Sequence, residues 1–413
     1  MTEKVLRVLE YDKITERLAE RASSQLGKEL ASALVPFTQL EQVQSEQKET
    51  TDAVTCILRK GSPPLGGIHD IRSQIRRAEA GGMLSPGELL KIADVLRASR
   101  RLKAYLTEDK MELAQTNVVA VLCGSLGTNR TLEERLTQSV ESEDTLSDFA
   151  SPLLASIRRN IRRAQDSIKE KLNHIIHSAQ NKKYMQDAVV TLRGDRYVVP
   201  VKQEHRNQIP GLVHDMSSSG ATLFVEPMAV VEANNEIRQL RSKEEQEVER
   251  ILLELTAEVA NIGGMLQENA ELLARIDFAF AKARLSLDMK ATEPVLNRER
   301  RIVIKRGRHP LIDPKLVVPI DIDLGGSFST MVITGPNTGG KTVTLKTTGL
   351  FVLMSQAGLH IPAADQSEMG IFHQVFADIG DEQSIEQSLS TFSSHMTNIV
   401  QILKNVDQDS LVL

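Results

Sequence analysis

The chain has 413 residues, enough for two or three domains, and its 55 acidic and 50 basic side chains give a net charge of −5. A chain that is acidic overall is not a general nucleic-acid binder, so any such contact must come from a local basic patch. Aromatic residues make up 3% and Trp is absent, which argues against a single-strand binder built on stacked aromatic side chains.

The two cysteines, Cys56 and Cys123, have no metal-ligand spacing around them. They exclude a disulfide framework and suit a reducing compartment, so we expect a cytoplasmic protein. The chain contains no apolar run of about 18 residues, and its first residues lack the apolar core of a signal peptide. We therefore expect no membrane partner.

Residues 1–150 predict a helical core or lever domain, because apolar residues recur at steps of three and four. Residues 61–67, rich in Gly and Pro, predict a loop, and 68–80 predict a helix after it. A further helix is expected to begin at Ser85, with Pro86 in its first turn and Glu88 completing a capping box.

Residues 151–290 contain two long helical patterns. The first has an apolar seam at Ile157, Ile161, Ala164, Ile168, Leu172 and Ile175. The second has a seam at Ile237, Leu240, Val248, Ile251, Leu255, Val259, Ile262 and Leu266, with Glu244, Glu245, Glu247 and Glu249 expected on its exposed faces. Two long, narrow seams predict an antiparallel coiled-coil arm, in which a helix of about 35 residues reaches roughly 50 Å. A pair of ordinary packed helices is the alternative.

The segment between these helices has the chemistry of strands. Residues 188–192 and 197–201 flank one turn, and residues 211–215 and 221–225 flank another. We therefore expect a β-rich tip at about residues 187–227.

Basic residues gather on the arm and its tip. We propose as nucleic-acid contacts Arg158, Arg159, Arg162, Arg163, Lys182, Lys183, Arg193, Arg196 and Lys202. Because the whole chain is acidic, this clustering favours a surface that grips a phosphate backbone. An ordinary solvated surface is the alternative.

Residues 291–413 predict an α/β domain. Short strands are expected at 301–304, 316–320, 329–334 and 372–377, and a helix is expected to open at 387–396. Residues 329–334 lead into a loop that matches G-x-x-x-x-G-K-[ST], and a helix is expected from 343 to 354. The loop consists of Gly335, Pro336, Asn337, Thr338, Gly339, Gly340, Lys341 and Thr342.

A buried strand, a glycine-rich loop and a helix together predict a nucleotide site. The loop amides and the helix N-terminus would hold phosphates. Lys341 would reach the outer phosphates as the catalytic residue, and the Thr342 hydroxyl would hold magnesium, so we expect ATP and Mg²⁺ as cofactors. The alternative, a simple turn before a helix, would not need the Lys-Thr pair.

Hydrolysis also needs an acid on a second buried strand. Residues 410–413 have the composition of that strand, but the acid does not follow. We therefore interpret the chain as truncated before the Walker B acids and expect little ATP turnover. The alternative is that Asp378, Asp381 or Glu382 supplies the acid.

Three segments carry a family resemblance. Residues 335–347, 378–396 and 213–227 resemble, respectively, the nucleotide loop, the segment that crosses a dimer, and the clamp tip of the MutS family in its bacterial type-2 subgroup. The resemblance covers essentially the whole chain. It implies a multidomain protein with an all-α core or lever, an antiparallel coiled-coil clamp arm with a β-rich tip, and a partial P-loop ATPase domain of the ABC type.

The resemblance also implies site residues and partners. It adds Val343 to the nucleotide loop, places a base pocket at Val317 and Val318, and has Ser390 and Thr391 act on the other subunit's phosphates in a homodimer. The implied partners are branched or double-stranded DNA. For the type-2 subgroup, restraint of recombination and splitting of collided ribosomes are also implied.

The chain departs from the family pattern in three respects. It lacks the mismatch-reading domain, so mismatch repair is not expected. It also lacks the Walker B acids and the C-terminal nuclease module. The leading hypothesis is an ATPase clamp on nucleic acid. The alternatives are a binding fragment that does not hydrolyse ATP and a coiled-coil ATPase that organises chromosomes, for which the arm is short.

Overall fold

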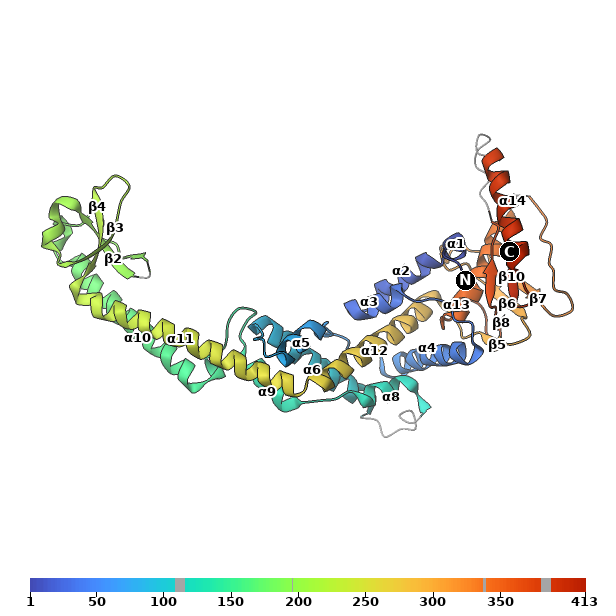
Figure 1. Ribbon diagram of the computed structural model, residues 1–413, viewed down its shortest axis with the longest axis horizontal. Helices are drawn as coiled ribbons and strands as arrows, with labels where there is room; N and C mark the ends of the chain where they lie inside the picture. The colour runs from blue at the N-terminus through green and yellow to red at the C-terminus, as the bar shows by residue number, and fades with distance from the viewer. Residues whose placement is uncertain (108–115, 195, 337–338, 380–387) are drawn as a thin grey trace. The chain divides into compact units, whose positions relative to one another are not determined.

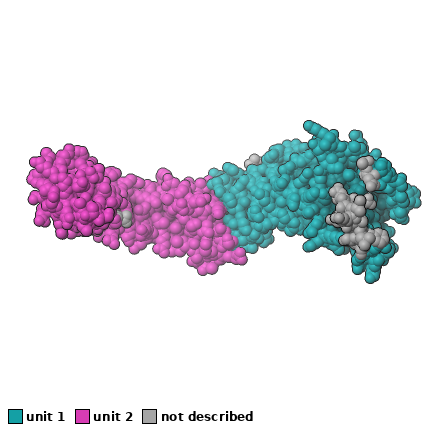
Figure 2. All heavy atoms as spheres, turned by 90° about the horizontal axis from the view of Figure 1, so that it is seen from above, with its two compact units in different colours: residues 1–72, 94–130, 264–413 teal, residues 73–93, 131–263 magenta. Residues whose placement is uncertain are grey.

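The computed structural model describes residues 1–107, 116–194, 196–336, 339–379 and 388–413, without the side chains of residues 388–394. It contains two compact units (Figure 2). Unit 1 comprises residues 1–72, 94–130 and 264–413, and unit 2 comprises residues 73–93 and 131–263. None of the helices in the described part of the chain is both long and apolar enough to cross a bilayer. The domain boundaries expected near residues 150 and 290 stay predictions.

Unit 1 contains most of the helices in the described part of the chain, and Figure 1 labels them. They are α1 (Glu3–Val8), α2 (Tyr11–Arg21), α3 (Gln25–Ser32), α4 (Leu40–Lys60), α8 (Val118–Ser125), α12 (Gly263–Met289, apart from its first residue), α13 (Lys341–Gln356) and α14 (Ser388–Asn405). The boundary between the units falls within α6 (Pro86–Thr107).

Two sheets accompany these helices. The larger has the order β5-β8-β6-β7, built from β5 (Val295–Asn297), β6 (Ile302–Gly307), β7 (Ile320–Leu324) and β8 (Glu368–Gly370). The smaller pairs β9 (Gln374–Phe376) in parallel with β10 (Ser410–Val412), as the apolar residues near position 410 predicted.

The hydrophobic core of unit 1 surrounds α13. Every residue of this helix from Thr347 to Gln356 is buried. Apolar side chains of α1, α2, α12 and the larger sheet belong to the same cluster. At Gly349 an added Cβ would lie 2.8 Å from Leu9 Cδ1, so the two segments approach closely. The second half of α13 is thus fixed in the core, and its first turn remains at the surface.

Unit 2 holds two long helices, α10 (Pro152–His177) and α11 (Met228–Asn261), which lie side by side (Figure 1). Ser151 meets Glu247 and Arg158 meets Glu244, so the helices run antiparallel. The remaining helical elements are α5 (Arg72–Glu79, apart from its first residue), α9 (Arg130–Ser139, likewise), and the 3-10 turns η1 (Asp148–Ala150), η2 (Asn181–Lys183) and η3 (Gln203–Gln208).

A four-stranded sheet joins α10 to α11. It is antiparallel with the order β1-β2-β4-β3, from β1 (Thr191–Arg193), β2 (Arg196–Lys202), β3 (Gly211–Met216) and β4 (Thr222–Pro227). Residues of β2 and β4 pack with α10 and α11 in one core cluster. The predicted strands of this segment are therefore confirmed, with shifts of a few residues.

The predicted apolar seams are largely buried. On α10 the seam ends at Ile176, which is 4% exposed, and the predicted Ile175 is only half-buried. On α11, Leu240 and Val248 are half-buried. The second seam was predicted to continue to Leu266, which was too far, because α11 ends at Asn261 and a separate helix follows.

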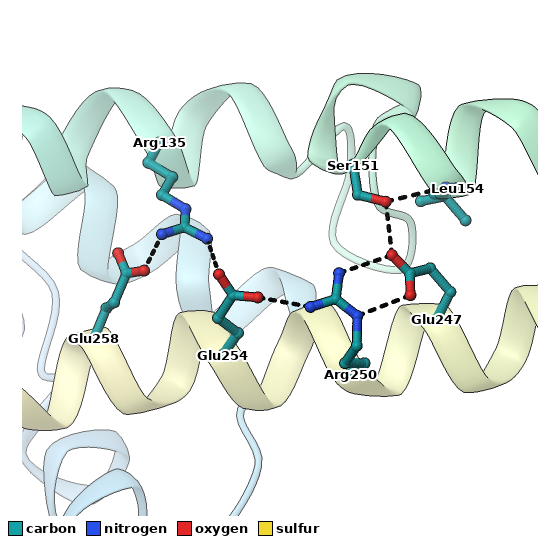
Figure 3. A network of polar contacts seen from close by, with 7 residues as sticks. All are labelled: Arg135, Ser151, Leu154, Glu247, Arg250, Glu254 and Glu258. Carbon is teal, nitrogen blue, oxygen red and sulfur yellow. Dashed lines mark hydrogen bonds and ion pairs between the residues drawn. The ribbon is translucent and has the colours of Figure 1, made fainter.

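Glu247 was expected on an exposed face, and this was wrong. Its side chain is 5% exposed and accepts hydrogen bonds from Ser151 Oγ and from two nitrogens of Arg250 (Figure 3). Arg250 also donates to Glu254, which pairs with Arg135. The hydrogen bond from Arg250, followed by that from Ser151, lowers the pKa of Glu247 to about 2. Partners that the helical pattern could not reveal make the burial of this carboxylate possible.

Two further expectations concern the starts of helices. The capping box is confirmed, since the Ser85 amide donates to Glu88 Oε2 (2.9 Å) and the Glu88 amide donates to Ser85 Oγ (3.3 Å). The helix expected from residue 68 begins only at Arg72.

Two predicted strands are absent. Of the strand expected at 316–320, only Ile320 belongs to a strand, β7. The amides of Leu316 and Val317 donate to Asp313 O, which closes a turn that ends at Leu316, and residues 317–319 are irregular. Residues 329–334 form no strand either, and Val332 is 81% exposed. A β-branched run becomes a buried strand only where neighbouring strands pair with it, and no described strand pairs with this one.

Candidate nucleotide site and basic surface

The glycine-rich loop needs glycine for its backbone angles. Gly335 has φ = +142° and Gly340 has φ = +81°, values that side chains with a Cβ rarely adopt. An added Cβ would meet no atom of the described residues within 4 Å at either position, so the constraint that these residues show is conformational. Asn337 and Thr338, also predicted to hold nucleotide, lie outside the described residues.

A helix was expected from residue 343, and α13 is found there but begins two residues earlier, at Lys341, so that the last two loop residues are its first. The Lys341 ammonium donates to Gly335 O over 2.7 Å, so the side chain folds back over the loop. Thr342 and Val343 are exposed in the first helical turn. The first amides of a helix have no partner within it and carry partial positive charge. The arrangement therefore offers an ammonium, a hydroxyl and helix amides around one loop.

One turn further along α13, Lys346 contacts Glu10 at the start of α2 (Nζ to Oε2, 3.4 Å). Glu10 has φ = +59° and also accepts from Lys13 over 2.5 Å. The hydrogen bond from Lys13 is the main cause that lowers the pKa of Glu10.

The predicted base pocket is brought together only in part. Val317 lines a cavity of about 240 Å³ whose walls include Arg17, Arg308 and His309. Burial lowers the pKa of His309, so its ring is neutral near pH 7. Val318 does not line this cavity and is 78% exposed.

The remaining nucleotide residues lie near α14. The backbone of Ser390 and Thr391 forms the first turn of this helix, and their side chains lie outside the described residues. Asp381 and Glu382, alternatives for the acid, also lie outside them. Asp378 follows β9 and is already engaged, because it contacts His395 Nδ1 (3.0 Å) and accepts from Asn398 Nδ2 (2.8 Å).

The nine basic residues proposed as nucleic-acid contacts differ in exposure. Arg158 is 20% exposed and pairs with Asp148 and Glu244. Arg196 is 15% exposed and pairs with Glu226. These two side chains are therefore engaged in ion pairs within unit 2.

The other basic residues are more accessible. Arg193 lies 4.4 Å from the centre of the Phe224 ring and 3.4 Å from Asp215, and Lys202 is half-buried. The exposed members are Arg159, Arg162, Arg163, Lys182, Lys183 and Arg193.

Sequence reasoning missed the buried carboxylate that anchors the tip. Glu226 is fully buried and contacts His214 Nε2 (2.5 Å), Arg196 Nη1 (2.9 Å) and Asn234 Nδ2 (2.7 Å). The available signal was a single acid between Val225 and Pro227 in an otherwise apolar strand.

Comparison with known proteins places these features in a family. Residues 331–413 match the model of MutS domain V. Over all 413 residues the chain is 62% identical to Endonuclease MutS2 of Acetivibrio thermocellus, 56% to that of Ruminiclostridium cellulolyticum and 54% to that of Clostridioides difficile. The chain belongs to the type-2 MutS family. The resemblance drawn from the three sequence segments is thereby confirmed. This type-2 MutS chain covers 52% of the length of each of these relatives, so it spans about half of the curated proteins it matches.

Proposed function

We propose that this type-2 MutS chain binds ATP at residues 335–343 and is part of a DNA-associated ATPase. The observation that carries the proposal is the glycine loop that opens α13, with Lys341 folded over the loop at Gly335. The similarity of all 413 residues to about half of a protein named Endonuclease MutS2 supports the DNA-associated part. The proposal does not include mismatch repair.

The residues present fit a magnesium nucleotide. Lys341 would hold the outer phosphates, the helix amides would hold the inner ones, and Thr342 would hold Mg²⁺. When bound, the metal would neutralise phosphate charge. We also propose that Val317 borders the base, and that Ser390 and Thr391 contact the nucleotide of a partner subunit in a homodimer.

The antiparallel helices of unit 2 would serve as the clamp arm. Arg159, Arg163, Lys182 and Lys183 are exposed and able to contact phosphates. We propose that the nucleotide state moves this arm on branched or double-stranded DNA, within a three-part organisation of residues 1–150, 151–290 and 291–413. Collided ribosomes present similar phosphate chemistry and are the second candidate partner, and a cytoplasmic location suits both.

We propose that this chain binds ATP but turns it over slowly. Asp378 is held by His395 and Asn398, so it is poorly placed to serve as the acid that hydrolysis needs. In its extreme form, this proposal is the alternative of a fragment that binds ATP without hydrolysing it.

Labelled duplex and four-way-junction DNA test the proposal directly. ATP should change the affinity of the wild-type chain for at least one of them and should have no effect on Lys341→Ala. Lys305→Ala, which removes an exposed lysine of β6, is the matched control and should behave as wild type. DNA binding that ignores ATP in all three proteins would contradict the proposal. Tight binding to ribosomes alone would shift it to the second partner.

A further inference from the structure

Helix α4 closes the C-terminal end of the loop helix α13. The last carbonyls of a helix lack partners within it, and here side chains of α4 bind one of them and two carbonyls just beyond the helix. Gln47 Nε2 donates to Ser355 O and Leu359 O, both over 2.9 Å. Thr50 Oγ1 donates to Gly358 O over 2.6 Å. Gln47 is 1% exposed and Thr50 is fully buried, so water cannot replace these bonds at low cost.

The segment that precedes α4 binds the same end. The Phe37 amide donates to Gln356 O over 2.9 Å, and Gln356 Nε2 returns a hydrogen bond to Phe37 O over 2.7 Å. Gly358 has φ = +74°, and an added Cβ there would lie 2.4 Å from Glu46 Cβ. The contact between α4 and the end of α13 therefore has little free space.

Helix α12 joins this contact through buried charged and polar groups. Lys282, with a fully buried side chain, lies 2.8 Å from Glu46 Oε2 and 3.3 Å from Glu49 Oε1. His360 bridges Ser286 Oγ of α12 (2.7 Å) and Thr51 Oγ1 of α4 (2.9 Å). Helices α4 and α12 and residues 355–360 thus form one polar junction, which we call the α13 junction.

We propose that Gln47 and Thr50 are positioning residues that couple nucleotide occupancy of the loop to helix α4 through the α13 junction. This inference rests on the proposed nucleotide binding. Helix α13 is 16 residues long, so it acts as a rod of about 24 Å between the two ends. Ligand contacts at its first turn shift or stiffen the rod. The buried hydrogen bonds of the α13 junction transmit this shift or stiffening to α4, because closely packed interfaces have little room to absorb a movement.

Amide hydrogen exchange with and without ATP and Mg²⁺, read separately over α13 and α4, tests the coupling. In the wild-type chain we expect ATP to slow exchange in both helices. Gln47→Met and Thr50→Val keep the shape of each side chain but remove its hydrogen bond. Both variants should bind ATP within a few-fold of wild type and keep the response of α13. The response of α4 should fall from about 5-fold or more to none. Gln44→Met, at an exposed position of α4, is the matched control and should keep both responses.

Two results would overturn the inference while leaving nucleotide binding intact. One is an α4 response of wild-type size in both variants. The other is a wild-type chain in which α13 responds to ATP and α4 does not. Thr50→Val is the milder change and decides the matter if Gln47→Met does not fold. A wild-type chain that fails to bind ATP would instead overturn the proposed function, and the coupling with it.

Discussion

The Ser151 hydroxyl donates to Glu247 Oε1 over 2.7 Å and accepts the Leu154 amide over 3.0 Å (Figure 3). One side chain therefore caps the first turn of α10 and also holds a buried carboxylate of α11. The four-stranded sheet connects the C-terminal end of α10 to the N-terminal end of α11. The hydrogen bond between Ser151 and Glu247 therefore helps to hold the two helices in register at the opposite end of α10.

Ser151→Ala should destabilise unit 2 by about 1–2 kcal/mol, because it removes a helix cap and one partner of a buried carboxylate. Urea unfolding followed by circular dichroism measures the change. Ser156→Ala, at an exposed position of the same helix, should have little effect. Equal stability of the two variants would show that the Ser151 contact does not stabilise the fold.

Arg196→Ala should destabilise the β-rich tip by about 1–3 kcal/mol, since it removes the arginine from the described contacts of the buried Glu226 and leaves those with His214 and Asn234. Limited proteolysis within residues 187–227 reports on the tip. Arg206→Ala, an exposed arginine of the same region, is the control. If Arg196→Ala resists proteolysis as well as the wild-type chain, the contact between Arg196 and Glu226 does not stabilise the tip.

Charge reversal at Arg159 and Arg163 should weaken DNA binding and leave stability within about 0.5 kcal/mol of wild type, because both side chains are exposed. The slope of log affinity against log salt should become shallower by about one for each phosphate that the variant no longer neutralises. Fluorescence anisotropy at several salt concentrations measures it, with reversal of the exposed Arg298 in unit 1 as control. An unchanged slope would move the DNA-binding surface elsewhere.

His360 should make the chain less stable in mild acid. Burial lowers its folded pKa to about 4 from an ordinary value of 6.5. Between these values the unfolded chain binds one more proton, so the free energy of unfolding falls as pH drops from 6.5 toward 4, by up to about 1.4 kcal/mol per pH unit. The loss between pH 7 and pH 5 should be about 2 kcal/mol smaller in His360→Gln. If the free energy of unfolding falls equally with pH in both proteins, His360 is not the source of the acid sensitivity.

Features encoded within a few residues were predictable from the sequence. The Ser85–Glu88 capping box needs only four residues, and the α10 seam was placed to within one position at Ile176. The glycine loop before α13 is also local, because its φ angles and its lysine are properties of one short segment.

Features that depend on distant partners were not predictable. Residues 329–334 have strand composition but no described neighbour to pair with, so composition alone misled. Gln47 looks like an ordinary polar residue of α4, and its partner Ser355 lies 308 residues further along the chain. The burial of Glu247 likewise depends on Ser151, 96 residues earlier. A periodic pattern identifies a face but not which polar side chains on it find buried partners.

Equilibrium binding of labelled ATP to the wild-type chain, Lys341→Ala and Lys305→Ala tests the central claim most directly. We expect saturable, magnesium-dependent binding by the wild-type chain and Lys305→Ala, and at least about 10-fold weaker binding by Lys341→Ala, a loss of about 1.4 kcal/mol. Equal affinity in all three proteins would contradict the assignment of residues 335–343 as the nucleotide site.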